Sequence, residues 1–135
     1  MTTMSTSPHA RRLAWSAAIG WMTVIFGASS LPGTALPSSG AAPYAHFGAY
    51  AVLGLLLYMA ILHDVPEPRR AFVLAVLFAS AYGVTDELHQ AFVPGRTPDV
   101  ADWGIDTLGA LCGAAMTRYA IERIARATPA ARPRR

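Results

Sequence analysis

Four long apolar segments, separated by short stretches rich in proline, glycine or charge, constrain the fold of this 135-residue chain more than any other feature. The segments cover about residues 13–31, 44–62, 71–92 and 100–121. A helix of about 19 residues spans roughly 28 Å at 1.5 Å per residue, close to the hydrocarbon thickness of a bilayer. The sequence therefore predicts an all-α membrane protein, a bundle of four transmembrane helices.

Composition agrees with this prediction, because 53% of the residues are hydrophobic and only 14% are charged, against about 25% charged in soluble domains. The first segment could alternatively be a signal peptide, with Arg11 and Arg12 before it and small residues at 28–30. Its apolar run is longer than a usual signal core and three more spans follow, so we expect a retained helix. Cys112 lies in an apolar run, so we expect a buried thiol.

The arginines predict the orientation, since cytoplasmic loops of membrane proteins carry an excess of basic residues. If the spans alternate, ten of the eleven arginines fall on one side and only Arg96 on the other. Both termini are then cytoplasmic, and residues 32–43 and 93–99 form the outer loops. The expected organisation is a cytoplasmic segment 1–12, a membrane domain 13–121 and a disordered Arg-rich cytoplasmic tail 122–135.

Polar residues gather where the third and fourth segments approach the outer side. Asp86, Glu87 and Gln90 lie near the end of the third segment. A carboxylate within the bilayer is costly, so it should have a partner. The fourth segment has Asp102 and Asp106 on one helical stripe.

Gly109 and Gly113 continue this stripe, and small residues at such spacing allow close helix approach. We expect the stripe to pack against the third helix. On that expectation, Gly113→Leu harms folding more than Gly54→Leu.

Several of these residues could have either a structural or a functional role. Arg96 either ties its loop to one or two acids or binds an anionic ligand. His46, which shares a helix face with Tyr50, is either a hydrogen-bond partner or a catalyst. His89 is either an interfacial polar residue or a metal ligand, and Asp99 is expected to cap the fourth helix.

These residues resemble the VanZ-like family. The similarity lies in an ordered set of residues, with Asp106 where the family usually has Asn: His46, Phe47, Tyr50, Leu53, Gly54, Asp86, Glu87, Gln90, Phe92, Pro94, Gly95, Arg96, Asp102, Asp106, Gly109 and Gly113. The resemblance implies a multi-pass protein of the bacterial cytoplasmic membrane. Through the family's namesake, it also implies a role in teicoplanin resistance for some members.

Two main functions follow as hypotheses. The first is binding of an envelope lipid or lipid-linked cell-wall precursor at an outward-facing polar site, with a contribution to resistance against glycopeptides or cationic peptides. The alternative is a membrane enzyme acting on a lipid phosphate, in which Glu87, Asp102 and Asp106 hold a divalent cation and His46 or His89 is the general base.

Transport is a third option, although four short spans offer no evident pathway without oligomerisation. We expect no cofactor, no resident metal and no nucleic-acid partner. The catalytic residues and the oligomeric state stay open.

Overall fold

The protein is all α-helical in a computed structural model that describes residues 7–35 and 42–128. Four long helices follow one another along the chain, and the all-α part of the prediction is confirmed. A short 3₁₀ turn, η1, covers Gly33–Ala35. The helices are α1 (Pro8–Ser29), α2 (Ala42–Asp64), α3 (Pro68–Gln90) and α4 (Val100–Ala127).

The helices differ from the predicted segments mainly at the chain ends. Helix α1 begins at Pro8, where the Ser7 side chain accepts the Ala10 N–H and proline occupies the first helical position. Helix α4 continues to Ala127, and Glu122 forms ion pairs with arginines on both sides along this last stretch. The expected disorder therefore does not apply to residues 122–127. Residues 1–6, 36–41 and 129–135 of the predicted end segments and outer loop lie outside the described residues.

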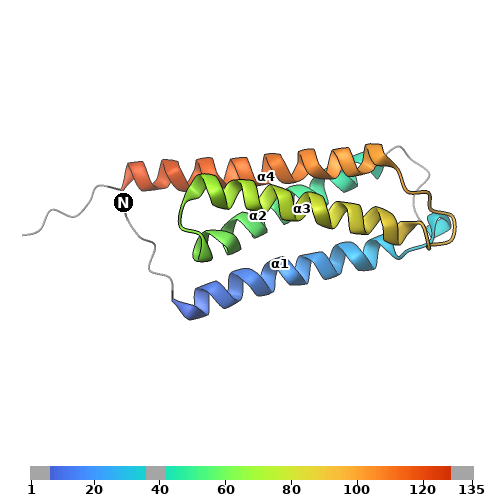
Figure 1. Cartoon of the computed structure of the whole chain (residues 1–135), viewed down its shortest axis with the longest axis horizontal. Helices are drawn as coiled ribbons and strands as arrows, with labels where there is room; N and C mark the ends of the chain where they lie inside the picture. Colours follow the sequence, from blue (N-terminus) through green and yellow to red (C-terminus); the bar gives the residue numbers. More distant parts are fainter. Residues whose placement is uncertain (1–6, 36–41, 129–135) are drawn as a thin grey trace, which may run out of the picture.

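Consecutive helices run antiparallel (Figure 1). Helices α2 and α3 each contact the other three, and the most extensive contact joins α2 and α4. Residues 31–35 and 91–99 lie together at one end of the bundle, which we call the loop end (Figure 1). The start of α1, the end of α4 and the connection 65–67 lie at the opposite end. Helix α1 packs mainly against α2 and makes no contact with α4 within the described ranges.

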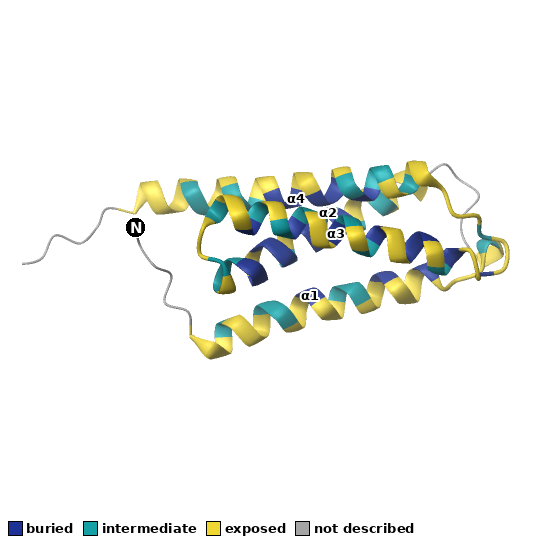
Figure 2. Ribbon diagram, in the orientation of Figure 1, coloured by how far each residue is buried: buried dark blue, intermediate teal, exposed yellow. Residues whose placement is uncertain are grey.

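Buried residues line the faces that the helices turn toward one another, and exposed residues cover the outer faces (Figure 2). The core contains many small residues together with a few large ones. The buried core includes Ala75, Ala79 and Ala110, all fully covered. Phe26 and Leu77 are among many large apolar residues left exposed. In soluble proteins large exposed apolar patches are uncommon. By length and composition, α2 and α3 can each cross a membrane.

Cys112 is exposed, which contradicts the expected burial of its thiol. The stripe of α4 that turns inward carries Gly109, Ala110, Gly113 and Ala114. Cys112 is not part of this stripe, and its side chain lies on the outward face of α4.

The closest helix contact joins α2 and α4, and glycine makes it possible. A Cβ atom on Gly113 would overlap the backbone carbonyl of Ala51, and one on Gly109 would overlap that of Phe47. In return, Gly54 of α2 faces the backbone of Ala110. The predicted packing of the glycine stripe against the third helix is therefore wrong, because its partner is α2.

Helix α1 is held by polar contacts from aromatic side chains. The Trp21 indole N–H donates to the Ala49 carbonyl at 2.8 Å, and the Tyr82 hydroxyl donates to the Met22 carbonyl at 2.7 Å. Near the opposite end, Trp15 donates to Asp64 at 2.8 Å. These contacts fix α1 against α2 and α3 although its helix interface is the smallest in the bundle.

The geometry predicts that Gly54→Leu and Gly113→Leu both impair folding strongly, in place of the larger effect first expected at Gly113. Overpacking a core typically costs about 1–3 kcal/mol, and here the obstacle is backbone that cannot rotate away. Gly48→Leu is the matched control, because nothing lies within 4 Å of a Cβ there. The measurement is the yield of monodisperse, detergent-solubilised protein and its thermal stability. Normal yield for Gly54→Leu would contradict the glycine contact.

Candidate functional site

The candidate site lies at the loop end of the bundle, where three helices bring polar side chains into a largely apolar interior. His46 comes from the second turn of α2, Glu87 from the last turn of α3 and Asp106 from the second turn of α4. Because consecutive helices are antiparallel, the start of α2, the end of α3 and the start of α4 all lie at the loop end of the bundle. Asp86, Glu87, Gln90 and Asp106 are all buried.

Asp106 is the most deeply buried of these side chains, at 0% exposure. One of its oxygens, Oδ1, lies 3.0 Å from Nδ1 of His46. The other oxygen, Oδ2, has no hydrogen-bond partner among the described residues. A Cβ atom on Gly83 would lie 3.4 Å from this second oxygen, so the absence of a side chain on α3 makes room for the Asp106 carboxyl.

Glu87 links the end of α3 to the start of α4. Its Oε2 accepts the backbone N–H of Asp99 at 2.8 Å. The Asp99 side chain in turn accepts the N–H of Ala101 at 2.8 Å, as expected for an N-terminal cap. Glu87 therefore fixes the position from which α4 enters the bundle.

Glu87 also belongs to a group of three residues with possible metal-ligating atoms. Donor atoms of His46, Glu87 and Asp106 all lie within 4.8 Å of one another, and we call these three residues the His46 group. Asp102, which the sequence placed with Glu87 and Asp106 in the enzyme hypothesis, is half-buried and is not in this group.

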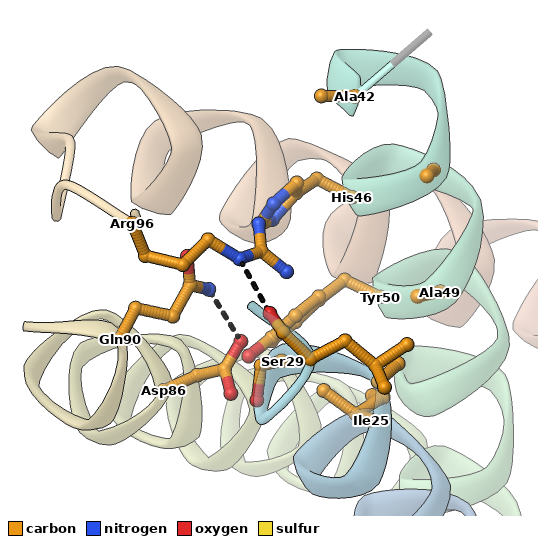
Figure 3. Close-up of a pocket in the computed structure, with 12 residues that line it drawn as sticks. Ile25, Ser29, Ala42, His46, Ala49, Tyr50, Asp86, Gln90 and Arg96 are labelled. Carbon is orange, nitrogen blue, oxygen red and sulfur yellow. Dashed lines mark hydrogen bonds between the residues drawn. The ribbon is translucent and has the colours of Figure 1, made fainter. Parts of the chain in front are cut away.

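A cavity of about 300 Å³ opens between α1, α2 and the end of α3 (Figure 3). Its walls are mostly apolar, and its polar groups come from α2, α3 and the turn after α3. The lining residues are Ile25, Ala28, Ser29, Leu31, Ala42, Ala45, His46, Ala49, Tyr50, Asp86, Gln90 and Arg96.

Two buried polar atoms of residues that line the cavity have no hydrogen-bond partner in the part of the chain that the structure describes. They are the hydroxyl of Tyr50, a residue 1% exposed, and Oδ1 of Asp86, a residue 3% exposed. The other Asp86 oxygen accepts from the Gln90 amide at 3.3 Å. Buried polar groups normally have partners, so a donor and an acceptor are available to a bound molecule.

Arg96 extends over the cavity from the turn after α3 (Figure 3). Its Nε donates to the Leu31 carbonyl at 3.3 Å, and within the described ranges it forms no ion pair. The expected tie between Arg96 and an acid is therefore not found. The turn depends on Gly95, whose φ of 73° lies in the left-handed region, and on close approach to Gly33.

The structure separates the remaining sequence candidates from this centre. His89 stacks on Phe26, with ring centroids 4.3 Å apart, and lies 2.9 Å from the Ser30 hydroxyl. It therefore connects α3 to α1. Asp102 belongs neither to the cavity lining nor to the His46 group.

Sequence reasoning missed the contribution of α1 to the cavity. Ile25, Ala28, Ser29 and Leu31 line it, yet they read as ordinary members of an apolar span. A single sequence carries no signal that distinguishes such wall residues from lipid-facing ones.

Comparison with known proteins decides the family. The VanZ/LLP1 family model matches residues 14–122, which is most of the chain. The chain belongs to the VanZ/LLP1 family. No curated protein and no solved structure matches it. The VanZ/LLP1 match covers α2, α3 and most of α1 and α4, so the cavity and the His46 group both lie within the family region.

The two tyrosines near the cavity predict opposite responses to loss of their hydroxyls. Tyr50→Phe removes a hydroxyl without a partner and should leave thermal stability unchanged or raised. Tyr82→Phe removes the bond to Met22 and should cost about 0.5–1.5 kcal/mol. Thermal unfolding of the two purified variants in the same detergent measures this. Equal destabilisation would show that the Tyr50 hydroxyl has a partner.

Proposed function

We propose that this VanZ/LLP1 protein is a multi-pass protein of the bacterial cytoplasmic membrane. In this proposal all four helices cross the bilayer, both termini are cytoplasmic and the loop end faces outward. Exposed large apolar side chains on every helix support it, as do two helices with the length and composition of membrane spans. The uneven distribution of arginines supports the orientation.

The proposed activity is binding of an anionic envelope lipid, such as a lipid-linked cell-wall precursor, at the outer leaflet. The observation that carries it is the cavity at the loop end, which combines apolar walls with polar groups that lack partners. Ligand sites commonly have this composition, with a few polar groups that fix orientation.

In this proposal the apolar side chains of the cavity contact the lipid chain, and the polar side chains contact the headgroup. Ile25, Ala28 and Leu31 offer an apolar wall for a lipid chain. Arg96 forms no ion pair in the described structure, so its guanidinium can meet a phosphate by a two-pronged contact. Tyr50 can donate a hydrogen bond to the headgroup, and Asp86 can accept one from a headgroup hydroxyl.

Sequestering or shielding such a lipid would reduce the access of glycopeptides or cationic peptides to the cell envelope. We propose that this is how the protein contributes to resistance against glycopeptides of the teicoplanin type or against cationic peptides. The family's name and the outward position of the cavity in the proposed topology support this role.

A membrane enzyme that acts on a lipid phosphate is the second candidate. The contact between His46 and Asp106 favours it, because a carboxylate that holds one ring nitrogen orients the other as a general base. His46 also lines the cavity. Within the described ranges its Nε2 has no hydrogen-bond partner in the protein.

Reporter fusions test the topology. Alkaline phosphatase, which is active only outside the cytoplasm, should be active when fused after Ser39 and inactive after Pro68 or Arg135. A cytoplasmic reporter should show the reverse pattern. Phosphatase activity at Arg135 would overturn the proposed orientation.

Arg96→Ala tests the binding proposal. We expect near-normal membrane abundance, because Arg96 forms no ion pair with any described residue. We also expect an affinity for an anionic lipid phosphate at least about tenfold lower, since a hydrogen bond to a charged group contributes about 1.5–3 kcal/mol. Native mass spectrometry and lipid titration of the purified protein measure this. Any teicoplanin or cationic-peptide resistance conferred by the wild type should be lost with it, and also in Glu87→Gln.

Arg70→Ala is the matched control, because Arg70 is an exposed arginine at the opposite end of the bundle. Its lipid affinity should equal that of the wild type. If the resistance phenotype falls only in proportion to folded protein, the site assignment is wrong. Release of inorganic phosphate from the lipid during the titration would favour the enzyme.

A further inference from the structure

The three-residue group behind the cavity suggests a function that lipid binding does not require. We infer that His46, Glu87 and Asp106 form a site for one divalent transition-metal ion. The inference rests on their mutual spacing, on the unpartnered oxygen of Asp106 and on the balance of charge around them.

The spacing is compatible with coordination to a single ion. Ligand atoms at about 2.0–2.2 Å from a metal lie roughly 3–3.5 Å from each other. Nδ1 of His46 and Oδ1 of Asp106 are already 3.0 Å apart, and Glu87 has an oxygen within 4.8 Å of both residues' donor atoms. A small shift of the Glu87 side chain would complete the set.

The buried oxygen Oδ2 of Asp106 provides an independent observation. Asp106 is fully buried, so its orphan oxygen cannot be satisfied by bulk water. An unpaired buried carboxylate oxygen is costly, and a cation bound by both oxygens, or by a shift of the carboxylate, would remove that cost.

Charge balance points the same way. Asp86, Glu87 and Asp106 are all buried. Asp86 adjoins Glu87 in the chain, and donor atoms of Glu87 and Asp106 lie within 4.8 Å of each other. Within the described ranges none of the three pairs with an arginine. Among the described residues, His46 is the only basic side chain that pairs with one of these acids. Burying several carboxylates with so little compensation is unfavourable, and a divalent cation would supply the missing positive charge.

The donor set indicates the type of ion. One imidazole nitrogen with two carboxylates suits Mn²⁺, Fe²⁺ or Zn²⁺ better than Ca²⁺ or Mg²⁺, which prefer oxygen ligands alone. Three protein ligands would leave a coordination position free, as in catalytic rather than structural zinc sites. The ligands come from α2, α3 and α4, so the ion would also join the three helices at the loop end.

Metal binding to the purified full-length protein tests the inference. After treatment with a chelator, titration with Mn²⁺ or Zn²⁺ should show one high-affinity ion per chain and raise the unfolding temperature. Asp106→Asn keeps the shape of the side chain but removes its charge, and His46→Gln removes the nitrogen ligand. Each should weaken binding by about a hundredfold or more and abolish the thermal shift, because even the loss of an outer-shell partner weakens a metal site by about 10–100-fold.

Two control variants separate this site from its neighbours. His89→Gln removes a histidine on the other side of α3, and Asp102→Asn removes the acid that the sequence had grouped with Glu87. Both should bind the metal as the wild type does. The ligand assignment is overturned if Asp102→Asn is as defective as Asp106→Asn.

The inference as a whole is overturned if wild-type protein binds neither ion, or if Asp106→Asn binds as tightly as the wild type. Should Asp106→Asn fail to fold, Glu87→Gln and His46→Gln give the same test. Titration of the Arg96→Ala protein with metal and, separately, with lipid distinguishes the two proposals, because loss of Arg96 should weaken lipid binding and leave metal binding intact.

Discussion

The close contact between α2 and α4 is the interaction on which the rest of the structure depends. Gly109 and Gly113 let the backbone of α4 approach the carbonyls of α2, and Gly54 allows the same approach from the other side. Small residues gain little from the hydrophobic effect but allow extensive dispersion contacts between backbones. This contact sets the register of the two helices, and that register places His46 beside Asp106.

Helix α3 and its following turn complete the site on this pair. Gly83 leaves space for the Asp106 carboxyl. Glu87 accepts a hydrogen bond from the backbone N–H of Asp99, the residue just before α4. The same acid therefore serves the fold by anchoring α4, while its second oxygen accepts only a long hydrogen bond from the Gln90 amide, at 3.5 Å. Such double use helps to explain why the polar centre can exist in an otherwise largely apolar interior.

The cavity and the His46 group are adjacent but chemically distinct. The cavity has apolar walls, an arginine without an ion pair in the described part of the chain and two unpartnered polar atoms, which fits an amphiphilic anion. The group behind it is rich in carboxylate and short of positive charge, which fits a cation. His46 belongs to both. A ligand in the cavity and a cation behind it would therefore influence each other through one side chain.

The sequence by itself determined the helical class, the number of helices and the family, because long apolar segments and an ordered set of polar residues are visible in one dimension. It also identified nearly all the polar residues of the loop end. Only the tertiary structure decided their partners. Gly113 meets α2 and not α3, and Arg96 meets a backbone carbonyl and not an acid. Helical periodicity fixes which residues share a face, but which neighbour that face meets depends on how four similar helices are arranged. The wall that α1 adds to the cavity depends on the same arrangement.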